Sequence, residues 1–375
     1  MSNKKIPVTL LTGYLGAGKT TLLNYVLGNQ KGYKVAVIVN DIGEVNIDAS
    51  LIENNGVVNQ KDDNLVPLSN GCICCTLKTD LMNQLIELAE SGKFNYILIE
   101  ASGICEPLPI AQSITALEDE SNPDFPHVVR LDNIVTVVDA KRMYDEFMNG
   151  EALHKENLDD DDIENLLIQQ IEFCNTIVLN KVDMISEKDK LQVEAVIRSL
   201  QKEAKIIECN YGHVELDEIF DTHNFDFEKV GMSAEWIKAL NEEEEEEPEG
   251  EALEYGISTF VYEARKPFDR VLFEEFVSSD WPTSIIRSKG LCWFSTERDM
   301  AFIFEQSGKQ KTLGEMGRWI ASAPKKKQEE LLRDNPDAAK NWDEVYGDRE
   351  ERIVFIGHNM DKEAIIKALD KCLTK

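Results

Sequence analysis

The amino-acid sequence predicts an α/β protein with a doubly wound, mostly parallel sheet, followed by a second, smaller α+β domain. Three observations lead to this fold class. Short apolar runs alternate with longer amphipathic segments through the first two-thirds of the 375 residues. The first run leads into a glycine-rich turn and then into a helical pattern. An acidic block follows much later, and beyond it strand-like runs outnumber helical ones.

Six apolar runs are expected as strands of the parallel sheet, because near-continuous apolar strands are buried on both faces. They are residues 6–13, 34–41, 96–103, 134–140, 176–183 and 204–210. Amphipathic stretches such as "TDLMNQLIELAESG" separate them and predict helices that cover the sheet. The first domain is therefore expected to span residues 1–225.

An acidic linker is expected at residues 226–252, where "NEEEEEEPEGEALE" combines like charges with proline. The second domain is then expected to span residues 253–375. Its runs predict, in order, strand 252–264, helix 268–279, strand 283–295, strand 299–308, a helical stretch near 313–335, strand 351–359 and helix 361–373. This succession is typical of a small α+β domain.

The net charge of −30 argues against nucleic acid or an anionic membrane as a partner, since both bind clustered lysine and arginine. No run approaches the roughly 18 apolar residues of a transmembrane helix. The apolar run after "MSNKK" is too short for a signal peptide. We therefore expect a cytoplasmic protein in a reducing compartment. Most of the five isolated cysteines are expected to be core residues; the five are Cys105, Cys174, Cys209, Cys292 and Cys372.

The stretch "GYLGAGKT" fits the P-loop pattern G-x-x-x-x-G-K-[ST] and lies between a predicted strand and a predicted helix. In such a loop, backbone N–H groups surround phosphate oxygens. Lys19 would reach the β- and γ-phosphates, and the Thr20 hydroxyl would ligate Mg²⁺. The residues expected to contact the nucleotide here are Gly13, Gly16, Gly18, Lys19, Thr20 and Thr21.

The stretch "LNKVD" at the end of a later strand indicates that the base is guanine. Asn180 can contact the base and Lys181 can lie over its ring. The Asp183 carboxylate only accepts hydrogen bonds, which suits the paired N–H donors of guanine that adenine lacks. Residues 208–210 follow the next strand and are a weaker candidate for a backbone contact to the base. GTP and GDP are thus the expected ligands.

Two further groups of residues are expected to act in hydrolysis. Glu100 and Gly103 lie at the tip of an apolar strand, where P-loop enzymes keep an acid near the metal and a glycine near the γ-phosphate. Asp41, Glu44 and Asp48 follow the second strand and predict a nucleotide-sensitive switch. The alternative is that they are surface residues without a role in hydrolysis. Lys19, Glu100, Asp41 and Glu44 are the expected catalytic residues. No obvious glutamine would position water, so we expect slow intrinsic hydrolysis.

The stretch "SNGCICCTLKTDL" brings three thiols to the start of a helix expected near Leu77. The partial positive charge of a helix N-terminus lowers thiol pKa, and thiolates bind soft or borderline metals. We expect two of Cys72, Cys74 and Cys75 to bind one ion, Cys72 first, with an acid, water or client protein completing the shell. Zinc(II) suits these ligands, while cobalt(II), copper(I) and nickel(II) stay open. A redox pair or packed thiols is the alternative.

Taken together, "GYLGAGKTTLLN", "VNDIGEVNID", "NGCICCTLK", "ILIEASGICEP", "VVDA", "LNKVD" and "FIGHNMDKEAIIKALDKCL" resemble the CobW-like GTPases, a metallochaperone branch of the P-loop GTPases. The resemblance covers nearly the entire chain. It implies that GTP hydrolysis is coupled to holding a transition metal at the C-x-C-C segment and passing it to a client metalloprotein. It also implies that the second domain meets clients.

The sequence departs from many such relatives in one respect. Where they carry a histidine-rich tract near the domain junction, this chain has residues 242–247, all glutamate, and only five histidines in total. Metal storage through histidine is therefore not expected. The remaining alternatives are a GTP-dependent regulatory switch with redox-sensing thiols, a chaperone for maturation of a cobalt or iron enzyme, and a non-hydrolysing scaffold. A homo-oligomer is left open.

Overall fold

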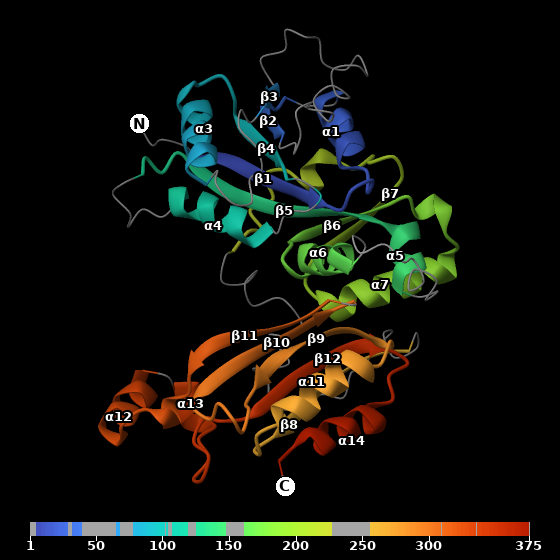
Figure 1. Cartoon of the computed structure of the whole chain (residues 1–375). Coiled ribbons are helices and arrows are strands. Elements are labelled where there is room, and N and C mark those ends of the chain that lie inside the picture. The colour runs from blue at the N-terminus through green and yellow to red at the C-terminus, as the bar shows by residue number, and fades with distance from the viewer. Residues whose placement is uncertain are drawn as a thin grey trace. The chain divides into compact units, whose positions relative to one another are not determined.

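The structure is a computed structural model that describes residues 5–28, 32–39, 65–67, 78–101, 103, 107–118, 125–147, 161–226, 256–308, 310–334 and 336–374. The chain divides into two compact units, Met1–Ala234 and Glu235–Lys375 (Figure 1). The predicted acidic linker lies almost wholly outside the described residues. Its bounds, and those of the two predicted domains, stay predictions.

The first unit is built on a seven-stranded sheet in which all neighbouring strands are parallel, with the order β3-β2-β4-β1-β5-β6-β7 (Figure 1). The predicted α/β class with a parallel sheet is confirmed. The strands are β1 (Ile6–Gly13), β2 (Val35–Val39), β3 (Leu65–Pro67), β4 (Tyr96–Glu100), β5 (Val129–Asp139), β6 (Thr176–Asn180) and β7 (Lys205–Cys209). Six of them overlap the predicted runs, although β5 begins five residues before the run predicted at 134–140. β3 was not predicted because three residues carry no periodicity.

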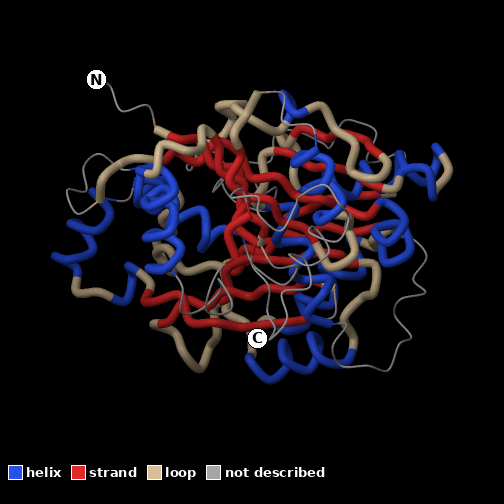
Figure 2. The backbone as a smooth tube through the Cα atoms, turned by 90° about the horizontal axis from the view of Figure 1, so that it is seen from above, coloured by secondary structure: helices blue, strands red, loops and turns tan. Residues whose placement is uncertain are grey.

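Helices cover both faces of this sheet, as the burial of β2 shows. Alternate residues of a strand point to opposite faces, and every residue of β2 is fully buried. Val35, Val37 and Val39 share a core cluster with α1 residues, while Ala36 and Ile38 face the opposite layer. The helices are α1 (Lys19–Gly28), α3 (Lys78–Glu90), α4 (Pro107–Glu118), α5 (Ala140–Phe147), α6 (Asp161–Glu172) and α7 (Glu187–Leu200). Figure 2 shows helices in blue beside the strands in red.

The strand order places the glycine-rich turn between two strands that are distant from it in sequence. β1 pairs with β4 on one side and with β5 on the other. Parallel strands end at the same edge of a sheet, and ligands of such folds bind at that carboxyl edge. The loops after β1, β4, β5 and β6 therefore meet at one edge.

The opposite, amino end of the sheet holds a buried polar cluster around Asp132. Its carboxylate accepts hydrogen bonds from the Tyr96 hydroxyl (2.7 Å), the Arg130 guanidinium (2.6 Å) and the backbone N–H groups of Thr222 (3.0 Å) and His223 (2.9 Å). Burial alone would raise the pKa of Asp132, but these hydrogen bonds outweigh it and lower the pKa. The cluster fastens the segment after β7 to the sheet.

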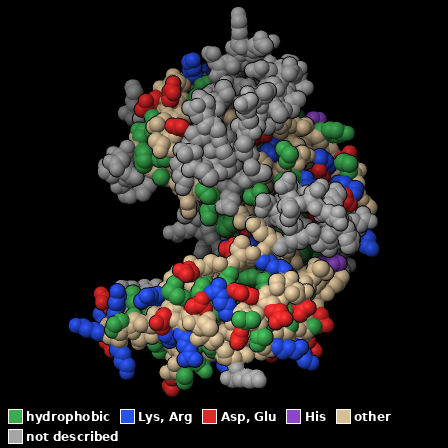
Figure 3. Space-filling view, in the orientation of Figure 1, with side chains coloured by type: hydrophobic (Ala, Val, Ile, Leu, Met, Phe, Trp, Pro, Cys, Tyr) green, Lys and Arg blue, Asp and Glu red, His purple; other side chains and the backbone are tan. Residues whose placement is uncertain are grey.

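The second unit contains a five-stranded antiparallel sheet with the order β11-β10-β9-β12-β8. Its elements are β8 (Ile257–Ala264), α11 (Arg270–Ser279), β9 (Ile285–Cys292), β10 (Met300–Ser307), β11 (Gln310–Arg318), α12 (Lys325–Asp334), α13 (Pro336–Lys340), β12 (Glu351–His358) and α14 (Lys362–Cys372). α11 and α14 pack on one face of the sheet through a core rich in phenylalanine. Acidic and basic side chains are interspersed over the face of this unit seen in Figure 3.

The helix predicted near residues 313–335 is wrong in its first part. Residues 310–318 form β11, which pairs with β10 and places Leu313 opposite Phe304. β11 is an edge strand and most of its residues are exposed, so its sequence shows no apolar alternation. Pairing with β10 decides its conformation. The helix begins only at Lys325.

Within the part of the chain that the structure describes, no helix combines the length and the apolar character needed to cross a lipid bilayer.

Candidate functional site

The glycine-rich turn between β1 and α1 has a backbone that other residues rarely adopt. Gly13, Gly16 and Gly18 have positive φ angles of 135°, 81° and 111°. At Gly18 a Cβ atom would also lie 2.2 Å from Nδ2 of Asn180, so no side chain fits there. α1 begins at the next residue, and its first turn offers backbone N–H groups without helical partners. Such a turn has the geometry that phosphate groups need, and phosphate binding here stays a prediction.

Lys19 is folded into this turn. Its side chain is buried, and Nζ donates hydrogen bonds to the carbonyl oxygens of Gly13 (2.7 Å) and Tyr14 (3.2 Å). The ammonium group is therefore held at the loop by the loop's own backbone, next to the N-terminus of α1. Thr20 is partly exposed on the first turn of α1, and Thr21 is exposed there.

Asn180, at the end of β6, connects the phosphate-binding turn to the loop after β7. Its side chain is 2% exposed. Nδ2 donates to the carbonyl of Ala17 (2.9 Å), and Oδ1 accepts the N–H of Gly212 (3.2 Å). The structure thus places Asn180 as a bridge between two loops, and its contact with a base stays a prediction.

Lys181 follows in a left-handed conformation, with φ 63° and ψ 32°. Its Nζ donates to the carbonyl of Gly16 (2.9 Å) and pairs with the carboxylate of Asp139. Asp183 is exposed in the next turn, and its N–H donates to Oδ1 of Asn210 (3.0 Å). The predicted phosphate and base motifs are therefore joined by direct hydrogen bonds.

Asp139 and Arg142 belong to this site but were not predicted from the sequence. One carboxylate oxygen of Asp139 pairs with Lys181, and the other accepts the N–H of Arg142 (3.0 Å) at the start of α5. The Arg142 guanidinium lies over the ring of Tyr14, 4.1 Å from its centroid, so it also contacts the phosphate-binding turn. The sequence signals for Asp139 are a carboxylate at the end of a buried strand and its place in the stretch "VVDA".

Glu100 and Gly103 lie at the end of β4 beside the phosphate-binding turn. Glu100 is 1% exposed and is paired in register with Leu11 of β1. At Gly103 a Cβ atom would lie 2.8 Å from the backbone nitrogen of Leu15, so only glycine allows this approach. The carbonyl of Gly103 accepts a hydrogen bond from buried Gln170 (3.2 Å), a contact that the sequence did not reveal.

The predicted magnesium ligands fit the ion chemically. Mg²⁺ prefers hard oxygen donors. The Thr20 hydroxyl and the Glu100 carboxylate are such donors. Thr20 lies on α1, which follows β1, and Glu100 ends β4, which pairs with β1.

The predicted switch acids Asp41, Glu44 and Asp48 and the thiols Cys72, Cys74 and Cys75 lie outside the described residues. α3 begins at Lys78, one residue after the expected start. Among the residues that the structure describes, no group of three or more His, Cys, Asp or Glu side chains is arranged to hold a metal ion.

Four of the isolated cysteines are buried free thiols, as predicted; they are Cys174, Cys209, Cys292 and Cys372. Burial raises the pKa of Cys174 to about 12 and that of Cys209 to about 11. Such thiols remain protonated at neutral pH and do not compete for metal. Cys105 lies outside the described residues.

Two family models match the chain. The nucleotide-binding domain of the CobW/HypB/UreG family matches residues 7–208, and the C-terminal domain of the cobalamin synthesis protein cobW matches residues 257–373. The chain is 37% identical to zinc-regulated GTPase metalloprotein activator 1 of Dictyostelium discoideum, over 99% of this chain and 80% of that protein. It is 30% identical to the zinc chaperone YjiA of Escherichia coli, over 78% of this chain and 83% of that protein.

Proposed function

Because this chain belongs to the CobW/HypB/UreG family of P-loop GTPases, we propose that it is a metallochaperone. It would bind a transition metal, zinc before others, at Cys72, Cys74 and Cys75, and pass it to a client metalloprotein under the control of GTP. The relatives named as a zinc-regulated activator and as a zinc chaperone support this choice of metal.

One observation carries the proposal, namely the register across the sheet. Pro67 of β3 pairs with Val39 of β2, Val39 pairs with Glu100 of β4, and Glu100 pairs with Leu11 of β1. Pro67 and Glu100 are thus separated by two strand spacings, roughly 10 Å. The thiol segment follows Pro67 within ten residues and ends at α3. Pro67, after which the thiol segment follows in the sequence, therefore lies at the edge that carries the nucleotide residues.

Each residue of the site would have a defined task. Lys19 and the turn around Gly13, Gly16 and Gly18 would bind the phosphates, and Asp183 would select guanine. Thr20 and Glu100 would hold Mg²⁺, which supplies positive charge to the β- and γ-phosphates when it is bound. Lys181, in the predicted base motif, supports the glycine-rich turn through its hydrogen bond to the Gly16 carbonyl. Asp41 and Glu44 would respond to the γ-phosphate.

The two ligands would be coupled. If GTP orders the loops at this edge and brings thiolates into ligand geometry, GTP tightens metal binding. By thermodynamic reciprocity, metal then tightens GTP binding by the same factor, typically about 5–150-fold. Hydrolysis would relax the geometry and allow transfer to the client.

The decisive experiment is a competition titration of zinc(II) against a chromophoric chelator, on reduced full-length protein with Mg²⁺. It is run with a non-hydrolysable GTP analogue and with GDP. We expect one equivalent of zinc to bind at least fivefold tighter in the GTP form. Cys72→Ser should abolish tight binding, whereas Lys19→Ala should bind zinc but lose the difference between nucleotides.

Equal zinc affinities in both nucleotide forms would contradict zinc gating. The titration repeated with cobalt(II) then tests maturation of a cobalt enzyme. If neither metal binds and reversible oxidation of the thiols changes GTP hydrolysis instead, the protein is a redox-sensing switch.

A further inference from the structure

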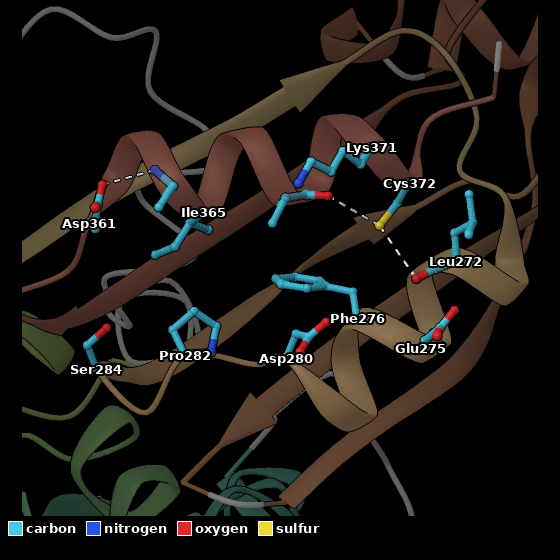
Figure 4. Close-up of a pocket in the computed structure, with 12 residues that line it drawn as sticks. Leu272, Glu275, Phe276, Asp280, Pro282, Ser284, Asp361, Ile365, Lys371 and Cys372 are labelled. Carbon is cyan, nitrogen blue, oxygen red and sulfur yellow. Dashed lines mark hydrogen bonds between the residues drawn. The ribbon is translucent and has the colours of Figure 1, made fainter.

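A groove of about 510 Å³ lies between α11 and α14 of the second unit (Figure 4). Its volume falls within the range of protein sites that take up ligands, about 300–1,000 Å³. The two helices have ten and eleven residues, so the groove is bordered by about 15 Å of helix on each side. It lies wholly within one unit and shares no residue with the nucleotide site.

The floor of the groove is apolar and belongs to the core. Phe276, Ile365 and Cys372 are 8%, 2% and 3% exposed, and all three belong to the hydrophobic cluster under the helices. Leu272 is 44% exposed at the rim, and its carbonyl accepts a hydrogen bond from the Cys372 thiol. The first turn of α11 is thereby tied to the last turn of α14.

The rim of the groove is acidic. Three of its four charged residues carry carboxylates, Glu275, Asp280 and Asp361, and the fourth is Lys371. Figure 4 shows Asp361 at the opposite end of the groove from Glu275, with Asp280 along the edge formed by α11. Asp361 also accepts the N–H of Ala364 (3.0 Å), which fixes its position at the start of α14. Carboxylates therefore stand at both ends of an apolar floor.

This chemistry selects one kind of occupant. A small polar metabolite would need polar groups on the floor, but the floor is formed by Phe276, Ile365 and the buried Cys372, and the hydroxyl-bearing Ser284 lies at one end of the groove. A second copy of this chain would bring a further charge of −30 against an acidic rim. A partner with apolar side chains flanked by lysine or arginine fits this groove, because its apolar side chains can pack on the floor and its basic side chains can pair with the carboxylates of the rim. An α-helix packed against two others presents such side chains at i, i+3 or i+4, and i+7.

We propose that the groove between α11 and α14 docks an amphipathic helix of a partner protein, with apolar side chains on the floor and basic side chains opposite Glu275, Asp280 and Asp361. The proposal uses only the second unit. It does not depend on metal binding or on nucleotide, so it can fail while the proposed function stands.

The probe is a fluorescein-labelled 16-residue helical peptide with leucine at i, i+3, i+4 and i+7 and lysine on both flanks. A matched peptide carries glutamate in place of each lysine. Fluorescence anisotropy with the full chain, GDP and Mg²⁺ should show saturable binding of the lysine peptide, at least tenfold tighter than that of the glutamate peptide. Raising the salt concentration should weaken the binding.

Variants of the groove locate the site. Leu272→Glu and Ala364→Glu should each weaken binding of the lysine peptide at least tenfold. Val271→Glu is the control, because Val271 is 71% exposed on the same helix but does not line the groove. The double variant Glu275→Lys with Asp280→Lys should reverse the preference between the two peptides. Circular dichroism and thermal unfolding of each variant report whether the second unit is folded.

Four results would overturn the proposal. They are no saturable binding of the lysine peptide, equal affinity for both peptides, an equal loss in Val271→Glu and in the groove variants, and an unchanged preference in the double lysine variant. If sedimentation shows that Leu272→Glu only dissociates a dimer, the occupant is a second copy and the proposal is also wrong.

Discussion

Asp132 and Asp139 are both on β5, seven residues apart, yet their carboxylates serve different purposes. Asp132, near the amino end, is fully buried and accepts four hydrogen bonds from the sheet and from the segment after β7. The side chain of Asp139, at the carboxyl end, is 15% exposed and pairs with Lys181, which in turn contacts the phosphate-binding turn.

The two carboxylates should differ in what their loss affects, because their hydrogen-bond partners have different roles. The partners of Asp132 belong to the permanent structure of the first unit, so its loss should cost stability. The partner of Asp139 connects two loops that we expect to contact the nucleotide, so its loss should weaken nucleotide binding. Four measurements test this contrast, and the largest expected effect comes first.

Asp132→Ala should lower the free energy of unfolding by about 3–5 kcal/mol, because it removes the acceptor of the buried Tyr96 hydroxyl and of two backbone N–H groups. It also removes one of the two ion pairs of Arg130, which keeps its pair with Asp221. Urea unfolding followed by circular dichroism measures this. Asp145→Ala is the control, since Asp145 forms a half-exposed ion pair with Lys141 on one helix and should change stability by at most about 1 kcal/mol. A variant that unfolds like the wild type would show that the amino-end cluster is not structural.

Lys19→Ala should lower kcat/KM for GTP on the order of 10²–10³-fold, because the ammonium group at the phosphate-binding turn is lost. Phosphate release under single-turnover and steady-state conditions measures this. Unfolding should change far less than in Asp132→Ala. If Lys19→Ala hydrolyses GTP at the wild-type rate, the residues at the carboxyl edge of the sheet do not take part in hydrolysis.

Asp139→Asn should speed dissociation of a fluorescent GDP analogue about tenfold, which corresponds to about 1.4 kcal/mol. Asparagine still caps α5 through the Arg142 N–H, but it no longer carries the charge that holds Lys181. Stability should stay near that of the wild type. Asp145→Asn is the matched control, and the idea fails if both variants release GDP equally fast.

The smallest effect concerns pH. The pKa of Asp132 is lower in the folded chain than its ordinary value, so the unfolded chain binds the proton more readily. The stabilisation is present above the ordinary carboxyl pKa near 4 and is lost as pH falls through the folded pKa. Between about pH 5 and pH 3 the wild type should therefore lose stability more steeply than Asp132→Asn. If both proteins lose stability equally as pH falls, other titrating groups determine the acid dependence of stability.

Much of the candidate site was predictable because its residues lie in short local patterns. The turn from Gly13 to Lys19 and the stretch from Asn180 to Asp183 each combine a buried strand with residues of special chemistry. Gln170 was not predictable, since it is a polar residue of an amphipathic helix and acquires its role only through its hydrogen bond to the Gly103 carbonyl. Arg142 similarly depends on the approach of Tyr14.

In the second unit the same limit applies to β11. Its residues are mostly exposed, and only the pairing with β10 makes them a strand. The helices α11 and α14 were predictable from their apolar spacing, whereas the groove between them was not, because their first residues are separated by 92 positions in the sequence.

The sequence by itself determined the parallel α/β class, most of the strands, the phosphate-binding turn and the base motif. These features rest on local backbone preference and on burial, which neighbouring residues encode. The tertiary structure decided the strand order, the bridge from Asn180 to Ala17, the different tasks of Asp132 and Asp139, and the acidic groove of the second unit. These depend on contacts between distant segments, whose formation is governed by packing and chain closure over many residues rather than by any local pattern.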